Sequence, residues 1–547
     1  MTRETNQPIR SRRWSRTGFR ARGARAVLPF AAALLAAAVP LLAEPAPAAA
    51  AASHDSAPHA APTPRAIDRY VRTYLAETGL PGATVTVTKG NRTLYAAGYG
   101  HTADGARMTK RTPVPIASMS KSFTALAVLQ LVEAGKVDLD RPVRRYLPEF
   151  RMADPRAARI TVRQVLDQTS GMADSTHPEL RLPPAHSLSD AVAKLRPARL
   201  ADTPGTAWNY HNPNYALAAR LVEVVSGLPY PDYLSRHVLR PLGMVHTRTA
   251  ATTDAMPEHA RGYVRAFGTV VERAHPHWFT GGAYDVVTTA GDLGRWLALQ
   301  NGDGRTRQGR RLVSARSLAT MHTPPRGPGA PRHDTYAMGW SQREGPGPLR
   351  IEHGGELLTQ NSFQVLLPGS GYGIAVTSNT GMNSGDDSVN LADGLVRLVQ
   401  GEQPKVTAPF SSTSDPVLGA LSLLALALAA LGVRRAGGWA ARMRGRRPWR
   451  VALRLLPYTV PLVLLGTAAD LFGLLMNRSG TLWQLTYVWP GLAVWLAANA
   501  LASGALLTAR TAALLRSRSA RAGTEAGAKA RARARPRRSN SAGGAVR

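Results

Sequence analysis

Three apolar stretches near the end of this 547-residue chain restrict what it can fold into more than any other feature. Pro416–Val433 carries no charged residue, Val451–Met476 carries only Arg454 and Asp470, and Thr481–Ala509 is again uncharged. An apolar run of about 18 residues or more is long enough to cross a lipid bilayer as a helix. The sequence therefore predicts a membrane protein with three transmembrane helices, over residues 416–433, 451–476 and 482–509.

The strong positive charge of the chain, +33 in total, lies mainly beside apolar segments. Residues 1–25 carry a net charge of +7, residues 434–454 a net charge of +8, and the tail from Arg510 onward a net charge of +10. Basic chains often bind nucleic acid, but arginines that flank apolar segments are typical of residues that set membrane orientation. We therefore interpret the charge as a topology signal and expect no nucleic-acid binding.

The distribution of arginine also predicts which side of the membrane each segment faces. The loop at 434–450 and the tail at 510–547 are rich in arginine, whereas the loop "NRSG" between the second and third stretches holds one. Because positively charged loops stay in the cytoplasm, the region 65–415 is expected on the outer side of a cell membrane. Asp470 then lies near the outer end of its helix, where it can reach water or Arg478.

The amino terminus has the pattern of an export signal. A basic region precedes the apolar run "AVLPFAAALLAAAVPLLA" (Ala26–Ala43), and small residues that suit cleavage follow it. We predict a signal peptide over 1–52, with an uncleaved signal anchor as the alternative. The other predicted boundaries are a linker at 53–64, a folded domain at 65–403, a second linker at 404–415 and a basic cytoplasmic tail at 510–547.

The folded domain alternates between strand-like and helix-like patterns. Ala83–Gly100 and Phe363–Asn379 each contain two β-rich runs around a turn, which predicts two hairpins. Helical patterns occupy Lys121–Ala134, Pro213–Val225 and Ala290–Gln300. Strands at both ends with helices between them predict an α+β domain, in which an antiparallel sheet is formed from both ends and a helical part is inserted.

Ser118 and Lys121 stand at the start of one helical pattern, in "PIASMSKSFTALAVLQLVEAGK". Residues at positions i and i+3 share a helix face, so the amine would lie beside the hydroxyl. A serine needs a neighbouring base to become a nucleophile, and a lysine can be that base when burial keeps it neutral. An arginine stays charged, which explains why a chain with few lysines has one here. A serine in this place can also be only a helix cap.

Two further motifs accompany this pair in order along the chain. "WNYHNPNY" supplies Tyr210-x-Asn212 ahead of a helical pattern, and "IEHGGELL" supplies His353-Gly354-Gly355 ahead of a hairpin. With these motifs the chain resembles the serine β-lactamase and penicillin-binding protein superfamily, in particular its branch of class C β-lactamases, D-alanyl-D-alanine carboxypeptidases and related esterases. The resemblance covers about residues 65–400 and implies an α/β/α sandwich with a helical subdomain.

The resemblance also implies a role for each matching residue. Ser118 would be the acylated nucleophile, and Lys121 would accept its proton. Tyr210 would pass a proton to the leaving group and later activate water. Asn212 would bind the substrate amide and hold Lys121. These roles predict hydrolysis through an acyl-enzyme.

The third motif, His353-Gly354-Gly355, differs from the Lys-Thr-Gly of β-lactamases. The backbone amide of the next residue, Glu356, would join that of Ser118 in an oxyanion hole. A lysine in place of His353 would be a fixed cation for a substrate carboxylate, whereas a histidine is mostly neutral at pH 7. Esterase and D-aminopeptidase-like relatives commonly have His-x-Gly at this place. The resemblance therefore implies a preference for esters or D-amino-acid amides and peptides.

Two other functions remain open on the sequence alone. One is a β-lactamase or D,D-carboxypeptidase proper, and the other is an acylatable sensor of cell-wall fragments or β-lactams that signals through the membrane helices. The chain has no cysteine, which excludes thiolate chemistry. His275 and His277 have no third ligand at a recognisable spacing, so we expect no metal and no cofactor. The expected partners are a small-molecule or peptidoglycan-like substrate and the lipid bilayer.

Overall fold

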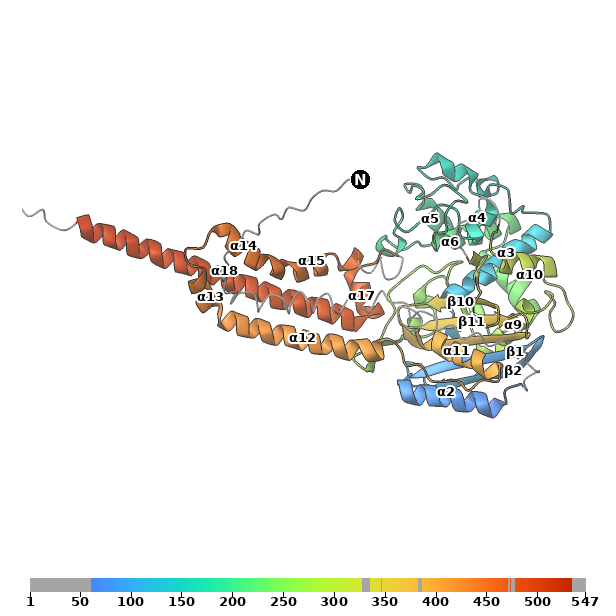
Figure 1. The fold of residues 1–547 in the computed structure, drawn as a ribbon. Helices are drawn as coiled ribbons and strands as arrows, with labels where there is room; N and C mark the ends of the chain where they lie inside the picture. Colours follow the sequence, from blue (N-terminus) through green and yellow to red (C-terminus); the bar gives the residue numbers. More distant parts are fainter. Residues whose placement is uncertain are drawn as a thin grey trace, which may run out of the picture. The chain divides into compact units, whose positions relative to one another are not determined.

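The computed structural model describes residues 61–533, apart from 327–334, 346, 382–385, 471–472 and 474–477. The predicted signal peptide, most of the first linker, part of the second apolar stretch and the end of the basic tail lie outside the described residues. The described part contains a mixed α/β domain and, after it, a series of helices (Figure 1).

The domain is built on an antiparallel sheet of seven strands in the order β2-β1-β12-β11-β10-β9-β8. The strands β1 and β2 form the first predicted hairpin, β11 and β12 form the second, and β1 pairs with β12. The two ends of the domain therefore meet in the sheet, as predicted. The strands are β1 (Gly82–Lys89), β2 (Arg92–Gly100), β8 (Tyr336–Ala337), β9 (Trp340–Arg343), β10 (Arg350–Glu356), β11 (Asn361–Leu367) and β12 (Tyr372–Ser378).

Helices cover both faces of the sheet and bury two cores. On one face lie α2 (Pro64–Thr78) and α11 (Asp386–Val399), which Figure 1 shows beside the strands. On the other face α9 (Ala290–Gln300) packs on β1, β2 and β12. Val85 and Val87 of β1 point into the α2 and α11 core, whereas Thr86 donates to the carbonyl of Ala290 at 2.7 Å. The domain is thus the α/β/α sandwich that the resemblance implied.

The chain between β2 and β8 forms the helical subdomain. Its two longest helices besides α9 are α3 (Ser120–Glu133) and α6 (Pro213–Ser226), which pack together. Proline suits the first position of a helix because that N–H would have no partner anyway. The other elements of this region are α4 (Val162–Leu166), α5 (Leu188–Ala193), α7 (Tyr230–Leu234), α8 (Arg240–Leu242), α10 (Ala315–His322) and the small sheet β3-β7-β4 (Val114–Pro115, Val286–Thr288, Arg248–Thr249). The strands β5 (Gly262–Ala266) and β6 (Thr269–Arg273) form a third sheet with β13 (Thr380–Gly381), which follows β12.

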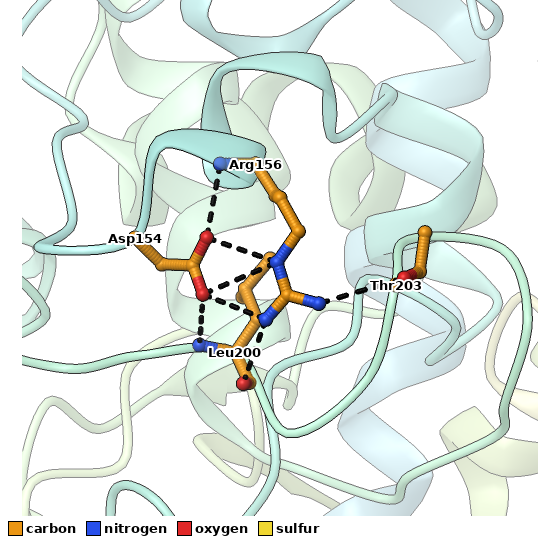
Figure 2. Close-up of polar contacts among 4 residues, drawn as sticks. All are labelled: Asp154, Arg156, Leu200 and Thr203. Atoms are coloured by element: carbon orange, nitrogen blue, oxygen red, sulfur yellow. Dashed lines mark hydrogen bonds and ion pairs between the residues drawn. The ribbon is translucent and has the colours of Figure 1, made fainter.

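Asp154 ties two segments of the helical subdomain together (Figure 2). Its carboxylate accepts the backbone N–H of Arg156 at 3.0 Å and receives the Arg156 guanidinium at 2.7 Å. The N–H of Leu200 also donates to Asp154, at 3.3 Å, and Arg156 donates to the carbonyl of Leu200 at 3.1 Å. The hydrogen bond from Arg156 holds the pKa of the Asp154 carboxyl well below its usual range. The contact fixes the start of the segment that leads to Tyr210.

Arg265 on β5 and Asp387 on α11 form a buried ion pair. The two carboxylate oxygens of Asp387 accept Nε and Nη2 of Arg265, each at 3.0 Å. The hydroxyl of Tyr74 donates to the same carboxylate at 3.0 Å and that of Thr380 at 2.6 Å. Four donors thus surround one carboxylate and join β5 and β13 to α2 and α11.

Three helical segments after the domain are long and apolar enough to cross a membrane. The α18 helix packs along α12, α13 and α15. The three segments are Ser411–Arg434 (α12), Pro448–Gly466, and Pro490–Arg531 within α18. The second comprises α14 (Pro448–Leu455), a short 3-10 turn (Leu456–Thr459) and α15 (Val460–Gly466), while α13 spans Ala436–Met443 and α18 spans Pro490–Arg533.

The predicted helix at 482–509 is divided in the structure, which corrects its boundaries. A separate helix, α17 (Leu482–Val488), begins at the N-cap Thr481. Trp489 then leaves the helical conformation, with φ −151° and ψ 80°. Pro490 explains the break, because a proline has no N–H for the preceding helix and restricts the residue before it. The candidate membrane helix therefore begins at Pro490 and continues past residue 509 into the basic tail.

Candidate active site

Ser118 lies in a strained turn that leads into α3. Residues Ala117–Met119 form a 3-10 turn and α3 begins at Ser120, so the serine precedes the helix that we expected it to start. Ala117 has a φ of +46°, in the left-handed region that residues with a side chain rarely adopt. Such strain persists only where the surrounding structure imposes it, often at a functional site. Here the turn places Ser118 at the wall of a pocket.

Lys121 lies in the first turn of α3 and reaches the serine. Its Nζ is 2.9 Å from Ser118 Oγ, and it donates to the carbonyl oxygen of Ala283 at 3.0 Å. The side chain is fully buried. Three tyrosine rings surround the amine, with centroids 4.9 Å (Tyr210), 5.7 Å (Tyr215) and 5.9 Å (Tyr284) from Nζ.

This environment favours the neutral form of the lysine. Burial lowers the pKa of Lys121 well below its usual value, and the positive charge of Arg478 lowers it further. Attraction to Glu179 and Asp285 opposes this shift but does not reverse it. A neutral amine has a lone pair, so Lys121 can take the proton of Ser118 when the serine oxygen attacks a carbonyl carbon.

Tyr210 and Asn212 lie beside the Ser118–Lys121 pair, just ahead of α6. Burial raises the pKa of the Tyr210 phenol to about 12, although Arg478 and a hydrogen bond with Ser118 lower it. Asn212 has partners other than the lysine that we expected it to hold. Its Nδ2 donates to Glu179, and its Oδ1 accepts Nη2 of Arg478 at 3.1 Å.

The strand β10 carries the third motif to the same place. A Cβ atom on Gly355 would lie 2.2 Å from the carbonyl oxygen of Ile116 and 3.1 Å from the backbone nitrogen of Ser118. Only a glycine therefore lets the strand pack this closely on the 3-10 turn. The contact brings the end of β10, next to Glu356, close to the backbone nitrogen of Ser118.

His353 is buried on β10 and neutral. Its Nδ1 lies 2.5 Å from the carbonyl oxygen of Gly354, and its Nε2 lies 3.3 Å from the hydroxyl of Tyr336. Because a carbonyl only accepts, Nδ1 carries the proton and Nε2 accepts from the tyrosine. Burial lowers the pKa of His353 to about 3, with a smaller contribution from Lys121. The imidazole therefore offers no positive charge at neutral pH.

Three ionisable residues near the pair received no role in the sequence analysis. Burial raises the pKa of Glu179 and raises that of Asp285 to about 7. Asp285 accepts the N–H of Gly282 at 3.1 Å. The third residue is Arg478, whose guanidinium lies 5.0 Å from the ring centroid of Tyr210. Its one sequence signal is that it is the single charge in the short loop "NRSG".

Ser118 faces a pocket of about 400 Å³. The residues that line it are Ser118, Trp208, Tyr210, Tyr336, Ser341, Glu352, His353, Gly354, Glu356, Phe363 and Arg478. A neighbouring pocket of about 320 Å³ is lined in part by Glu179, Asn212 and Tyr284. The structure thus gathers all three sequence motifs around one cavity, with the buried Lys121 beside its serine.

Comparison with known proteins agrees with this arrangement. Penicillin-binding protein 4 of Amycolatopsis lactamdurans is 30% identical over 349 residues, which cover 60% of this chain and 89% of that protein. The protein flp of Staphylococcus aureus (strain N315) is 29% identical over 320 residues, 57% of this chain and 62% of its own length. The chain therefore spans less than two thirds of the staphylococcal relative.

A solved structure and a family model add to these matches. The penicillin-binding protein from Bacillus halodurans has a TM-score of 0.50 and 25% identity, covering 59% of this chain and 98% of that one. The model of the family described as Beta-lactamase matches residues 67–397, which include Ser118, Tyr210 and His353. With this match over more than half of its length, the chain belongs to the beta-lactamase family of serine hydrolases.

Proposed function

We propose that this protein is a membrane-anchored serine hydrolase that acts through an acyl-enzyme on esters or on D-amino-acid amides and peptides. Its catalytic domain, residues 65–403, faces the outer side of the membrane. The observation that carries the proposal is the 2.9 Å approach of Lys121 Nζ to Ser118 Oγ, with the lysine buried among tyrosine rings. A base held in its neutral form beside a hydroxyl is the requirement for a serine nucleophile.

Acylation uses the groups that surround Ser118. The serine oxygen bonds to the carbonyl carbon of the substrate, and its proton passes to Lys121. The backbone amides of Ser118 and Glu356 stabilise the charge that develops on the carbonyl oxygen. Tyr210, whose phenol stays protonated, donates a proton to the leaving alcohol or amine as the scissile bond breaks, and Lys121 returns a proton to the tyrosine.

Deacylation reverses the proton transfers with water as the nucleophile. The oxygen of a water molecule attacks the acyl carbon while its proton passes through Tyr210 to Lys121. The bond to Ser118 then breaks, the acid product leaves, and Lys121 returns the proton to the serine oxygen. The cycle consumes one water per acyl group and restores the neutral lysine.

The neutral state of His353 supports the substrate class. β10 presents an uncharged imidazole where a β-lactamase has a lysine, so this strand provides no fixed cation for a carboxylate. β10 itself therefore requires no negative group on an ester or amide substrate. The name of the Amycolatopsis relative, a penicillin-binding protein, supports acyl groups of the kind that penicillin-binding proteins accept, with β-lactamase or D,D-carboxypeptidase activity as the alternative.

The proposal is tested with the full chain in detergent and a panel of p-nitrophenyl esters, D-amino-acid amides and a chromogenic cephalosporin. We expect Ser118→Ala to abolish turnover and covalent labelling by a fluorophosphonate probe, with an unchanged circular dichroism spectrum. A hydroxyl at the surface of a pocket contributes little to stability, so loss of labelling would report chemistry and not unfolding. Labelling that persists in the variant would place the nucleophile elsewhere.

The orientation rests on the arginine-rich loop and tail beside the candidate membrane helices. A reporter that is active only in the cytoplasm should be active when fused after Arg547 and silent when inserted at Ser479. The opposite pattern would place the catalytic domain in the cytoplasm and contradict the proposed location.

A second candidate function is the acylatable sensor, because a residue from the loop between two membrane helices contacts the site. Arg478 donates to Asn212, and its neighbour Ser479 donates to Asp174. A hydrolase should release the acyl group and turn over repeatedly, whereas a sensor should stay labelled after one equivalent. The same panel, followed over time by intact mass, separates the two.

A further inference from the structure

The segment that follows the second candidate membrane helix is attached to the catalytic domain. It includes Arg478 and the short helix α17, and hydrogen bonds join it to two separate parts of the domain. These run from Ser479 N to Asp174 Oδ2, from Gln484 Nε2 to the Leu180 carbonyl (3.2 Å), from Tyr487 Oη to the Ala274 carbonyl (3.0 Å) and from Arg273 Nη1 to the Thr486 carbonyl (2.8 Å). The start of this segment is therefore held beside the pocket.

Arg478 projects from this segment into the pocket that contains Ser118. Its guanidinium lies 5.0 Å from the ring centroid of Tyr210, and its Nη2 donates to Asn212 Oδ1 at 3.1 Å. Arg478 lines the same cavity of about 400 Å³ as Ser118 and His353. A residue 266 positions away from Asn212 in the sequence thus becomes part of the wall next to the nucleophile.

The charge of Arg478 distinguishes it from the other basic groups at the pocket. Burial lowers the pKa of Arg478, but attraction to Glu179 and Tyr210 outweighs this effect and the pKa ends above its usual value. Lys121 and His353 both have lowered pKa values, which favour their neutral forms. In the part of the chain that the structure describes, Arg478 is the one permanently positive side chain that lines this cavity.

The guanidinium also retains binding capacity. It has five N–H groups in a planar fork, and its hydrogen bond with a described residue is the one to Asn212. None of the described carboxylates is within ion-pair distance of it. Glu179 attracts the guanidinium from farther away and accepts a hydrogen bond from Asn212. A carboxylate is the group that a guanidinium fork binds best, through two parallel hydrogen bonds.

We propose that Arg478 binds a carboxylate of the substrate, so that the loop between two membrane helices completes a specificity subsite of the catalytic domain. The proposal rests on the proposed function. In this proposal Arg478 recognises a negative group of the substrate. The strand β10 cannot do so, because its His353 is neutral. The preferred substrates are then esters, amides or peptides that carry a carboxylate within reach of the Asn212 side of the pocket.

The test measures binding, so that it does not depend on whether Ser118 is the nucleophile. Full-length Ser118→Ala protein in detergent is titrated with two matched ligand pairs. One pair is N-acetyl-D-alanyl-D-alanine and its C-terminal amide, and the other is N-succinyl-D-alaninamide and N-acetyl-D-alaninamide. We expect the carboxylate to tighten binding in at least one pair by roughly tenfold to a hundredfold, and Arg478→Gln to remove this preference while the neutral ligand binds as before.

Two further variants separate charge from position. Arg478→Lys keeps the charge without the fork and should retain part of the preference. Arg181→Gln removes an exposed arginine of the neighbouring 3-10 turn Glu179–Arg181, which does not line the cavity, and should leave the preference intact.

Equal weakening of both members of a pair in Arg478→Gln would overturn the proposal, because it would show that the arginine only positions Asn212. The proposal would also be overturned if wild-type protein showed no carboxylate preference in either pair. A carboxylate preference that persists in Arg478→Gln would overturn it as well. If the preference follows Arg478 but wild-type protein turns over no substrate, the proposed function fails while the subsite stands.

Discussion

Lys121 and Arg265 are both buried in the described part of the catalytic domain, and their surroundings are opposite. Arg265 forms an ion pair with the carboxylate of Asp387, which also accepts hydrogen bonds from two hydroxyl groups. Lys121 faces a serine oxygen, a carbonyl oxygen and three aromatic rings. The first site pairs a buried charge fully and joins four elements of the fold. The second site holds Lys121 without an ion-pair partner, and its burial lowers the pKa of the lysine.

The difference shows how one domain uses burial for stability in one place and for chemistry in another. A buried charge that keeps its partners stabilises the arrangement around it, and removal of one partner is costly because the other remains buried. A buried lysine without such a partner loses its proton more easily. The comparison predicts that variants at the two sites affect separate properties.

The largest effect is expected for Lys121→Met, which replaces the proposed base by an apolar side chain of similar length. Without a group to accept the serine proton, kcat/KM for a p-nitrophenyl ester should fall by roughly 10²–10⁴-fold. The thermal unfolding temperature should change little, since the lost hydrogen bond to the Ala283 carbonyl is offset by the removal of a buried amine. The measurements are steady-state kinetics and thermal unfolding of the full chain in detergent.

Lys121→Arg is the control for this prediction. An arginine has a long basic side chain but cannot lose its proton. The Lys121→Arg variant should therefore be as inactive as Lys121→Met, and it should also be less stable than Lys121→Met. An active arginine variant would show that a neutral base at this position is not needed.

Asp387→Ala should produce the opposite result. The Arg265 guanidinium would remain buried with the larger part of its hydrogen bonds lost, which costs about 3–5 kcal/mol of unfolding free energy. Urea or thermal unfolding measures this loss. The protein that remains folded should keep the wild-type KM and pH profile, because none of the described atoms of the pair lines the Ser118 pocket. A changed pH profile would mean that the two sites are coupled.

Most of the framework could be predicted from the sequence because it depends on local pattern. The two hairpins and the helix at Ala290–Gln300 follow from alternation and from helical periodicity. The resemblance carried by the three motifs implied that Ser118, Tyr210 and His353 share one site, and the structure places them around one cavity. The break at Pro490 also had a local signal, but the uncharged run around it concealed the end of the helix.

The features that were missed depend on contacts between distant segments. Ala117 has a left-handed backbone just ahead of Ser118, and Gly355 on the distant strand β10 packs closely on the same turn. The partners of Asn212 come from Glu179 and from Arg478. No periodicity or motif records such an approach, so a sequence predicts which residues carry the chemistry better than it predicts what lies beside them.

A smaller effect is expected for Asp154→Asn, which tests a partly exposed pair against the fully buried one at Asp387. At neutral pH the variant should lose roughly 1–3 kcal/mol of unfolding free energy, because the charged acceptor of Arg156 and Leu200 is removed. The folded pKa of Asp154 is lowered, so its contribution is present above the unfolded value, near 3.8, and declines as pH falls below that value toward the folded pKa. The stability difference between wild type and variant should therefore shrink in acid. A difference that is constant from pH 7 to pH 3 would show that the charge of Asp154 contributes nothing.

The smallest effect concerns the pH dependence of the neutral lysine and brings the pocket wall into the comparison. Burial is the main reason for the lowered pKa of Lys121, and the charge of Arg478 is the second. Arg478→Gln removes only the second cause, so the pKa of Lys121 should rise part of the way toward its usual value. Because the base acts in its neutral form, the acid limb of kcat/KM for a neutral ester should move to higher pH in the variant.

Arg478→Lys and Arg181→Gln should keep the wild-type limb, the first because it retains the charge and the second because its charge lies outside the cavity. A limb that stays in place in Arg478→Gln would mean that burial alone keeps Lys121 neutral, and that the arginine acts on the substrate without acting on the base.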